Sequence, residues 1–184
     1  AEVNVNIPNY KIAKQLYNSS LKIVIENFGE SSSETIDQYY DMSKSFLEMK
    51  EFKKAINFAK KVLEYDIKNY GERHKYTAAD YSLISSIYDE MKNYKMALMN
   101  VENAFSANPE NYYYPYRIGK CHEKLKNISQ AIEYYVWSAD MLKEQKGVDD
   151  EDTKEAVKDA LRLANETNNL DLLPIWIKKI ANDQ

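Results

Sequence analysis

The sequence predicts an all-α fold in which antiparallel helix pairs repeat along the chain. Two observations support this prediction. The 184 residues include only four glycines and four prolines, and residues that favour helices are abundant. In addition, the same residue types recur at distances of 34 and 42 residues, which is typical of helical repeats. We therefore expect helices throughout and essentially no strand.

The clearest repeat unit covers residues 81–109. Aromatic and large apolar residues mark its first half, small residues mark its second half, and a proline ends it. The marks are Tyr81, Ile84, Ser85, Tyr88, Ala97, Val101, Ala104 and Pro109. Small residues at Ala97 and Ala104 would let two antiparallel helices approach closely, while the larger residues fill the space between them. The unit therefore predicts a helical hairpin.

The same marks recur at fixed distances on both sides of this unit. Ala131 lies 34 residues after Ala97, and Ala55 lies 42 residues before it. The distance of 42 residues also relates Gly29 to Gly71. Further pairs at this distance are Thr35 and Thr77, Tyr39 and Tyr81, Phe46 and Tyr88, Met49 and Met91, and Phe52 and Tyr94. Agreement at so many positions indicates a repeat architecture rather than chance.

These distances divide the chain into a leader and one repeat domain. We expect residues 1–9 to be the leader and residues 10–182 to form a single repeat domain. The segment from Tyr10 matches the second half of a unit, so the chain begins in mid-repeat, and we expect it to be a piece of a longer protein. The domain would contain a half repeat at 10–28, repeats at about 34–69, 76–109 and 112–145, and a degenerate repeat at 151–182.

Several residues should depart from regular helix geometry. Pro115 stands where an aromatic residue opens the other units, so its helix should start late or have a distorted first turn. Asn93 should take a positive φ at the corner between two helices, because asparagine tolerates that region. Leu173 stands in a small-residue position and is too large for it, which makes the final pair degenerate. Pro174 fits the first turn of the last helix, which should begin near Asp171.

The spacing of these marks resembles the tetratricopeptide repeat family over residues 10–182. The 42-residue step resembles the kinesin light chain branch, in which a longer helix carries a Gly-x-x-His motif. Gly71-Glu-Arg-His74, followed by Thr77-Ala78, matches that motif, although Lys75 replaces the proline usual after the histidine. The resemblance implies a right-handed solenoid with about nine helices. It also implies a non-catalytic module that binds proteins as a cytoplasmic scaffold or adaptor.

Composition limits the partners of the chain. Its formal net charge of −4 and pI near 5.4 argue against a nucleic-acid partner, because that binding needs a basic surface. Cys121 is the only cysteine and cannot form an internal disulfide, which fits a reducing, cytoplasmic compartment. No apolar run is long enough to cross a bilayer, so we expect no membrane insertion.

The sequence contains no catalytic constellation that we recognise. It lacks a zinc-binding His-Glu-x-x-His, a phosphate-binding glycine loop and a nucleophile motif. Cys121 and His122 are adjacent, but neighbouring residues on a helix point about 100° apart. His122 occupies an aromatic position of the repeat and is expected to pack. The acidic run at 149–152 is interpreted as the start of a helix rather than a calcium loop. We therefore expect no enzyme, no metal and no cofactor.

The resemblance implies that the first helix of each pair lines a concave groove. The predicted peptide-binding residues on these helices are Tyr40, Lys44, Tyr113, Tyr116, Arg117, Lys120, Lys124, Lys158 and Arg162. The positions from Tyr113 onward are basic and aromatic, which suits an acidic peptide with an aromatic or apolar anchor. An ordinary solvated helix face has the same composition and is the alternative interpretation.

Chaperone-binding members of the family clamp a terminal carboxylate with lysine and asparagine at fixed groove positions. The corresponding residues here are Tyr40, Lys44, Leu83, Tyr113 and Arg117. Only Arg117 agrees with the clamp. We therefore expect no binding of a peptide that ends in Glu-Glu-Val-Asp.

Three further functions stay open. The repeats could hold a large assembly together through convex or end surfaces, or they could form the sensor half of a regulatory enzyme. A pentatricopeptide-like RNA reader has a similar period but needs a basic groove, so we expect no RNA binding even at low salt. Charge reversal at Arg117, Lys120 and Lys124 would abolish groove binding and leave end-to-end assembly intact.

Overall fold

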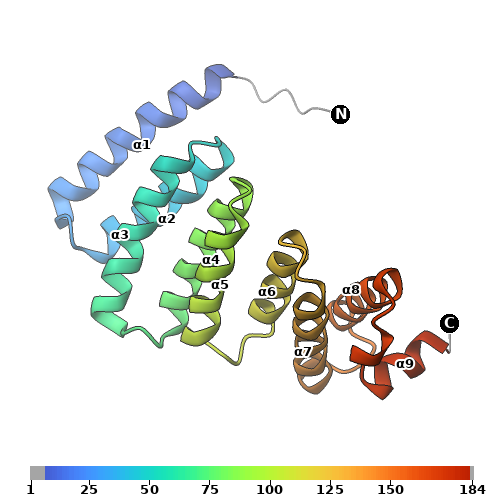
Figure 1. Ribbon diagram of the computed structural model, residues 1–184. Coiled ribbons are helices and arrows are strands. Elements are labelled where there is room, and N and C mark those ends of the chain that lie inside the picture. Colours follow the sequence, from blue (N-terminus) through green and yellow to red (C-terminus); the bar gives the residue numbers. More distant parts are fainter. Residues whose placement is uncertain (1–6, 183–184) are drawn as a thin grey trace. The chain divides into compact units, whose positions relative to one another are not determined.

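Figure 1 shows the computed structural model, which describes the backbone of residues 7–182. Side chains are described for Ile12 and for residues 15–180, and residues 1–6 of the expected leader lie outside the described residues. Within this part of the chain, nine α-helices and one short 3-10 helix form the regular structure, and no strand occurs. The predicted all-α fold of antiparallel helix pairs is confirmed.

The chain divides into two compact units, residues 1–72 and 73–184. The first unit contains α1 (Ile7–Phe28), α2 (Ser33–Glu48) and α3 (Phe52–Tyr70). Helices α2 and α3 form a pair, and α1 packs on α2 (Figure 1). Residues 7–9, expected in the leader, belong to α1, because Pro8 is compatible with the first turn of a helix.

The second unit contains the remaining helices, and each packs on the next along the chain from α4 to α8. They are α4 (Lys75–Glu90), α5 (Tyr94–Ala107), α6 (Tyr113–Lys124), α7 (Ile128–Lys146), α8 (Glu151–Thr167), the 3-10 helix (Leu170–Leu172) and α9 (Ile175–Asn182). Helices α4 and α5 form one pair, and α6 and α7 form the next. In both pairs a corner of three residues reverses the chain.

Four residues with positive φ mark the corners inside the helix pairs. They are Lys50, Lys92, Lys126 and Asn168, with φ of 57°, 58°, 66° and 57°. They lie 42, 34 and 42 residues apart, so the final pair keeps the repeat frame. The prediction of a positive φ at Asn93 is wrong, because its φ is −89° and its side chain accepts a hydrogen bond from the backbone N–H of Met96. Asn93 is the N-cap of α5, and the preceding lysine makes the left-handed turn.

Longer second helices that end at glycine produce much of the 42-residue step. Helices α3 and α7 have 19 residues, whereas α5 has 14. Gly29, Gly71 and Gly147 follow α1, α3 and α7 with φ between 90° and 96°, a region that favours glycine. The fully buried Thr35 and Thr153 donate hydrogen bonds to the carbonyls of Gly29 and Gly147 at 2.7 and 2.9 Å. Gly147 and Thr153 have the same spacing as Gly29 and Thr35. This third occurrence of a glycine followed six residues later by a threonine was not predicted from the sequence.

Pro115 delays helix α6, as predicted. Helix α6 has 12 residues, against 16 in α2 and in α4. Pro115 is its third residue and is buried, and its missing N–H removes no intrahelical hydrogen bond at that position. A cleft of about 390 Å³ lies beside this shortened helix, next to Tyr112, Tyr113 and Tyr116.

Small residues mark the contact within the first three helix pairs, as predicted. Ala55, Ala97 and Ala131 are fully buried. The hydroxyl of Ser43 donates to the carbonyl of Ala55 at 3.0 Å, and the hydroxyl of Ser85 donates to the carbonyl of Ala97 at 2.8 Å. A serine on the first helix therefore fixes the second helix at its small residue in two pairs.

The third pair has a glycine in place of this serine. A Cβ atom on Gly119 would lie 2.8 Å from Cδ1 of Tyr135, well inside van der Waals contact. The residues equivalent to Tyr135 in the earlier pairs are the smaller Ala59 and Val101. Tyr135 is fully buried, so the absence of a side chain at Gly119 is what makes room for its ring.

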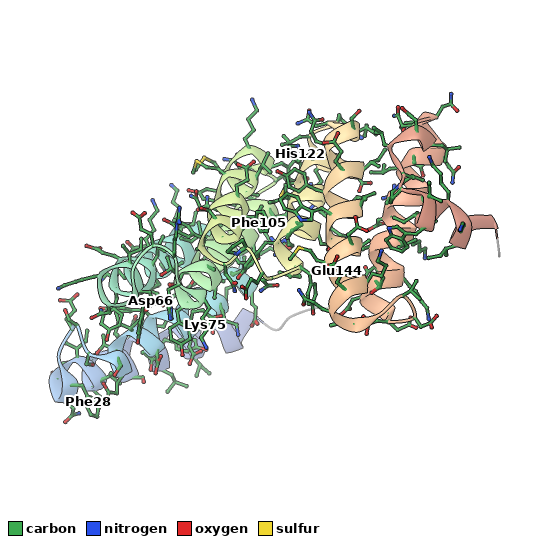
Figure 2. The ribbon with its side chains drawn as sticks, turned by 90° about the horizontal axis from the view of Figure 1, so that it is seen from below. Phe28, Asp66, Lys75, Phe105, His122 and Glu144 are labelled. Carbon is green, nitrogen blue, oxygen red and sulfur yellow. The ribbon has the colours of Figure 1, made fainter. Side chains whose placement is uncertain are left out.

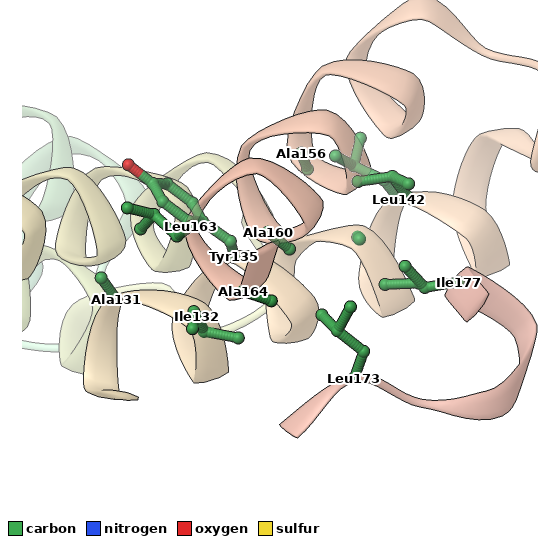
Figure 3. Packing of buried hydrophobic residues seen from close by; sticks show 12 residues of the cluster. Ala131, Ile132, Tyr135, Leu142, Ala156, Ala160, Leu163, Ala164, Leu173 and Ile177 are labelled. Atoms are coloured by element: carbon green, nitrogen blue, oxygen red, sulfur yellow. The ribbon is translucent and has the colours of Figure 1, made fainter. Parts of the chain in front are cut away.

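The last pair has an interrupted second helix. The 3-10 helix follows the corner, and α9 begins one residue after Pro174 and not near Asp171 as expected. Proline restricts the residue before it to extended backbone, and Leu173 has ψ of 135°. Leu173 and Ile177 nevertheless join the buried cluster that α7 and α8 form (Figure 3).

Candidate functional site

Polar side chains join the first helices α4 and α6. Lys124 on α6 pairs with Asp89 on α4 at 2.6 Å. About two helical turns away, Arg117 on α6 donates hydrogen bonds to Ser86 at 3.1 Å and to Ser85 at 3.5 Å. These contacts link two helices that are not adjacent in sequence.

A second set of polar contacts joins α6 to α8. The hydroxyl of Tyr116 lies within hydrogen-bond distance of Glu155 and Asp159, at 3.0 and 2.9 Å. Arg162 pairs with Glu123 at 2.9 Å. We call the surface formed by both sets of contacts the polar face. It comprises Ser85, Ser86, Asp89, Tyr113, Tyr116, Arg117, Lys120, Glu123, Lys124, Glu155, Asp159 and Arg162.

Most cations of the polar face have a carboxylate partner on a neighbouring helix. Lys124 pairs with Asp89, and Arg162 pairs with Glu123. Lys120 lies 3.8 Å from Asp159. The sequence predicts that this half of the groove is basic, but the charge of these three side chains is compensated within the protein. The acidic partners lie on different helices, so a count along one helix does not detect them.

Arg117 differs from the other cations of the polar face. Its guanidinium donates to Ser86 and to the hydroxyl of Tyr113, both at 3.1 Å, and it lies 5.6 Å from the centroid of the Tyr113 ring. Among the described residues it forms no ion pair with a carboxylate. Neutral partners thus hold the Arg117 side chain in place, and they do not neutralise its positive charge.

Two tyrosine hydroxyls hold the carboxylates of the polar face. Burial and hydrogen bonds to Asp159 and Glu155 raise the pKa of Tyr116 well above its usual range. Burial and a hydrogen bond of 2.7 Å to Glu123 raise the pKa of Tyr135 in the same way. Both hydroxyls therefore stay protonated and act as donors. The role of the Tyr135 hydroxyl and the contact of Glu155 were not predicted from the sequence.

The predicted groove residues Tyr40 and Lys44 belong to the first unit. The Lys44 ammonium lies 5.5 Å from the centroid of the Tyr40 ring on the same helix, α2. These two residues therefore form a local cation-π contact. The other seven predicted residues lie in the second unit.

Six of those seven residues are brought together in the polar face, and Lys158 is not. The six are Tyr113, Tyr116, Arg117, Lys120, Lys124 and Arg162. Lys158 is exposed on α8 and lines a different cleft. Sequence spacing placed all of them on first helices, but it did not show which of them are paired.

Cys121 and His122 are packing residues. Cys121 is 2% exposed, and burial raises the pKa of its thiol to about 11. The His122 ring stacks on Tyr134 with a centroid distance of 5.5 Å, and burial lowers its pKa. Figure 2 shows His122 on α6 in the second unit. Among the described residues, no group of three potential metal ligands occurs.

The buried Cys121 thiol should react slowly with thiol reagents in the native protein. We expect a rate about 100-fold below that of a free cysteine at pH 8, because both burial and the raised pKa reduce the accessible thiolate. Absorbance of a disulfide reagent measures the rate, and addition of urea should restore full reactivity. Fast native reaction would show that Cys121 is not enclosed between the helices.

None of the helices in the described part of the chain is sufficiently long and apolar to cross a bilayer.

The geometry defines the class of protein to which the chain belongs. Antiparallel helix pairs with capped corners that recur every 34 or 42 residues characterise a helical repeat protein. Residues 81–111 and 116–136 match the tetratricopeptide repeat family. These two segments therefore match tetratricopeptide repeats, as the marks at 81–109 predict.

Solved structures share this fold over most of the chain. The TPR-like repeats of a protein described as a kinesin light chain from Podosopora anserina have a TM-score of 0.73 and 8% identity, and the match covers 94% of this chain and 83% of that chain. For BtubC (BKLC) from P. vanneervenii the TM-score is 0.72 at 12% identity, with 92% and 70% covered. Similarity at these identities establishes the fold alone.

A third similar structure is a complex. The TPR2B domain of yeast Sti1, solved with pHsp70, has a TM-score of 0.58 and 13% identity, and the match covers 71% of this chain and 97% of that domain. A comparison with curated proteins gives no match.

Proposed function

We propose that the chain is a non-catalytic protein-interaction module that binds an acidic peptide segment on the polar face, as an adaptor or scaffold in the cytoplasm. Tetratricopeptide repeats stack into extended surfaces that suit this task. The observation that supports the ligand chemistry is the uncompensated guanidinium of Arg117, which neutral side chains hold on the polar face.

Arg117 is suited to receive a carboxylate. Its three hydrogen bonds to Ser85, Ser86 and Tyr113 use three of its five N–H donors, so two remain for a ligand. Because these neutral partners already restrict the side chain, less conformational entropy is lost on binding. A carboxylate bound there gains a charge-assisted hydrogen bond without displacing an internal ion pair.

The cleft beside α6 can take an apolar or aromatic anchor of the same peptide. It has a volume of about 390 Å³, and Tyr112, Tyr113, Tyr116 and Leu142 contribute to its lining. Tyr113 both contacts Arg117 and lines this cleft, so the two recognition elements adjoin. Aromatic side chains are well represented among residues that dominate binding energies. The complex of the Sti1 domain with pHsp70 shows that a chain of similar fold can engage a protein ligand.

A peptide selection followed by one substitution tests the proposal. Peptides selected from a random library on the intact chain should be enriched in Asp or Glu near an aromatic or large apolar residue. Arg117→Gln should weaken the selected peptides about 10-fold and reduce the salt dependence of their affinity, because one charge-assisted contact is lost. Fluorescence anisotropy at two salt concentrations measures both effects.

The choice of Arg117→Gln avoids a side effect of broader charge reversal. Reversing Lys120 or Lys124 would place like charges beside Asp159 or Asp89 and disturb the fold itself. Lys95→Gln, on the exposed surface of α5, is the matched control and should leave affinity unchanged. Selected peptides without acidic residues, or equal affinity for Arg117→Gln and the wild type, would contradict the proposal.

A structural role in a larger assembly is the second candidate, and exposed apolar side chains favour it. On α1, Ile12, Leu16 and Ile23 are 54%, 64% and 58% exposed. On α9, Ile175 is 74% exposed. Exposed apolar patches often mark interfaces. Assembly through these helices would persist in Arg117→Gln, which separates the two candidates.

A further inference from the structure

In the second unit, α6 contacts α4 and α8 contacts α6, so two first helices are each contacted by the next first helix. On α4, Ser85 and Ser86 are contacted by Arg117 of α6. On α6, Tyr116 and Lys120 are contacted by Asp159 of α8. Ser86 and Lys120 occupy the same repeat position, 34 residues apart, so this position is used twice as a contact for the next first helix.

On α8, the equivalent positions line an open cleft. Lys158 and Arg162 lie 42 residues after Tyr116 and Lys120, and they line a cleft of about 630 Å³. Its apolar lining consists of Val148, Val157, Leu161 and Ile180. We call this feature the α8 cleft.

The interrupted second helix explains why the α8 cleft is open. Trp176 of α9 donates a hydrogen bond to Asp140 of α7 at 2.8 Å, and the Lys143 ammonium lies 4.4 Å from its ring centroid. Helix α9 is thereby attached to α7, while its Ile180 forms a wall of the cleft. Leu161 also replaces the serine or glycine that adjoins the second helix in the other pairs.

The charges around the α8 cleft specify its ligand. Lys154, Lys158 and Arg162 line the cleft, and Asp149 is the one acidic residue that does so in the described part of the chain. Lys158 is exposed and takes part in none of the ion pairs formed by the described side chains, including those of Lys154 with Glu151 and of Arg162 with Glu123. An apolar floor with a cationic rim matches a helix that carries apolar and acidic residues.

We propose that the α8 cleft docks an acidic amphipathic helix of a partner protein, in the way that α6 docks α8. This inference concerns a surface other than the Arg117 site and does not depend on it. A second copy of the chain would offer its exposed α1, whose Lys11, Lys14 and Lys22 outnumber Glu26, so its charge does not match. The partner helix should carry two acidic residues four positions apart, as Glu155 and Asp159 are on α8.

A peptide of residues 150–168 of this chain is a suitable probe. It contains Glu155 and Asp159, which face Tyr116 and Lys120 in the intact protein and would face Lys158 and Arg162 in the cleft. A free helix of this length is only marginally stable in water. The peptide should therefore be prepared in linear form and in a lactam-bridged form that stabilises the helix.

Fluorescence anisotropy of the labelled peptide, titrated with the intact chain, measures its affinity. The proposal is tested by reversing charges on the protein, on the peptide and on both. Lys158→Glu in the protein should weaken the peptide about 10-fold. A peptide with Glu155→Lys and Asp159→Lys should bind the wild type about 10-fold more weakly and should regain affinity for the Lys158→Glu protein. Lys95→Glu is the matched control and should change neither affinity.

Other variants separate this proposal from its alternatives. If the peptide merely displaces the chain's own α8, the milder variant Lys120→Gln will weaken its binding and Lys158→Glu will not, which overturns the proposal. Failure of both peptide forms to bind the wild type overturns it as well. Lys158→Glu should leave the affinity of the peptides selected for the Arg117 site unchanged, so failure at the α8 cleft is distinguishable from failure of the Arg117 site.

Discussion

Replacing Gly119 with serine should destabilise the protein by about 1–3 kcal/mol, and the same serine should cost much less in a chain that also carries Tyr135→Val. The added Cβ atom would lie 2.8 and 2.9 Å from the Tyr135 ring, which is fully buried and cannot move into solvent. Valine at that position restores the combination found in the preceding pair, where Ser85 accompanies Val101. The two substitutions are therefore expected to be strongly coupled.

A double-mutant cycle measures this coupling. Tyr135→Val alone should also destabilise the protein, because it removes a buried ring and the hydroxyl that donates to Glu123. Urea unfolding of the wild type, both single variants and the double variant should give a coupling of about 1–3 kcal/mol in favour of the double variant. Additive losses would show that Gly119 is not required by the ring of Tyr135.

Ala97→Leu should lower the free energy of unfolding by about 1–3 kcal/mol. Ala97 is fully buried, and its carbonyl accepts the hydrogen bond of Ser85 from the facing helix. A leucine side chain would have to push α4 and α5 apart, which also weakens this hydrogen bond. Thermal or urea unfolding followed by circular dichroism measures the loss.

Ala79→Leu is the matched control for this prediction. Ala79 lies on α4 and is exposed, so the same chemical change meets no neighbouring helix there. Its effect should stay within about 0.5 kcal/mol. If Ala97→Leu were equally harmless, the small residue would not be needed at the helix contact, and the repeat frame assigned to α5 would be wrong.

The relation to other solved repeat proteins follows from the small number of constrained positions. A structure with 8% identity shares the fold over 94% of this chain. The contacts that fix each pair involve a small residue such as Ala97, a corner residue such as Lys92, and glycine where a long helix ends, as at Gly71. Most other positions can vary as long as the apolar periodicity is kept.

The parts of the fold that could be predicted from the sequence are those that local backbone geometry determines. Proline and glycine act through local backbone geometry, so Pro115 predicted the late start of α6 and Gly71 predicted the end of α3. Local preference alone gave a wrong prediction of positive φ at Asn93, because asparagine is suited both to an N-cap and to a left-handed turn. The positions of the two flanking helices decide between these roles.

The sequence by itself determined the helices, their pairing and the step between repeats, because each depends on residues within a few turns of one another. Only the tertiary structure decided the character of the site. Arg117 and Lys124 are both cations on one helix, yet Lys124 lies 2.6 Å from Asp89 whereas Arg117 is held by Ser86 and Tyr113. The strength of an ion pair falls as the spatial distance between its two charges increases. When the two residues are far apart in sequence, only the packing of their helices sets that distance.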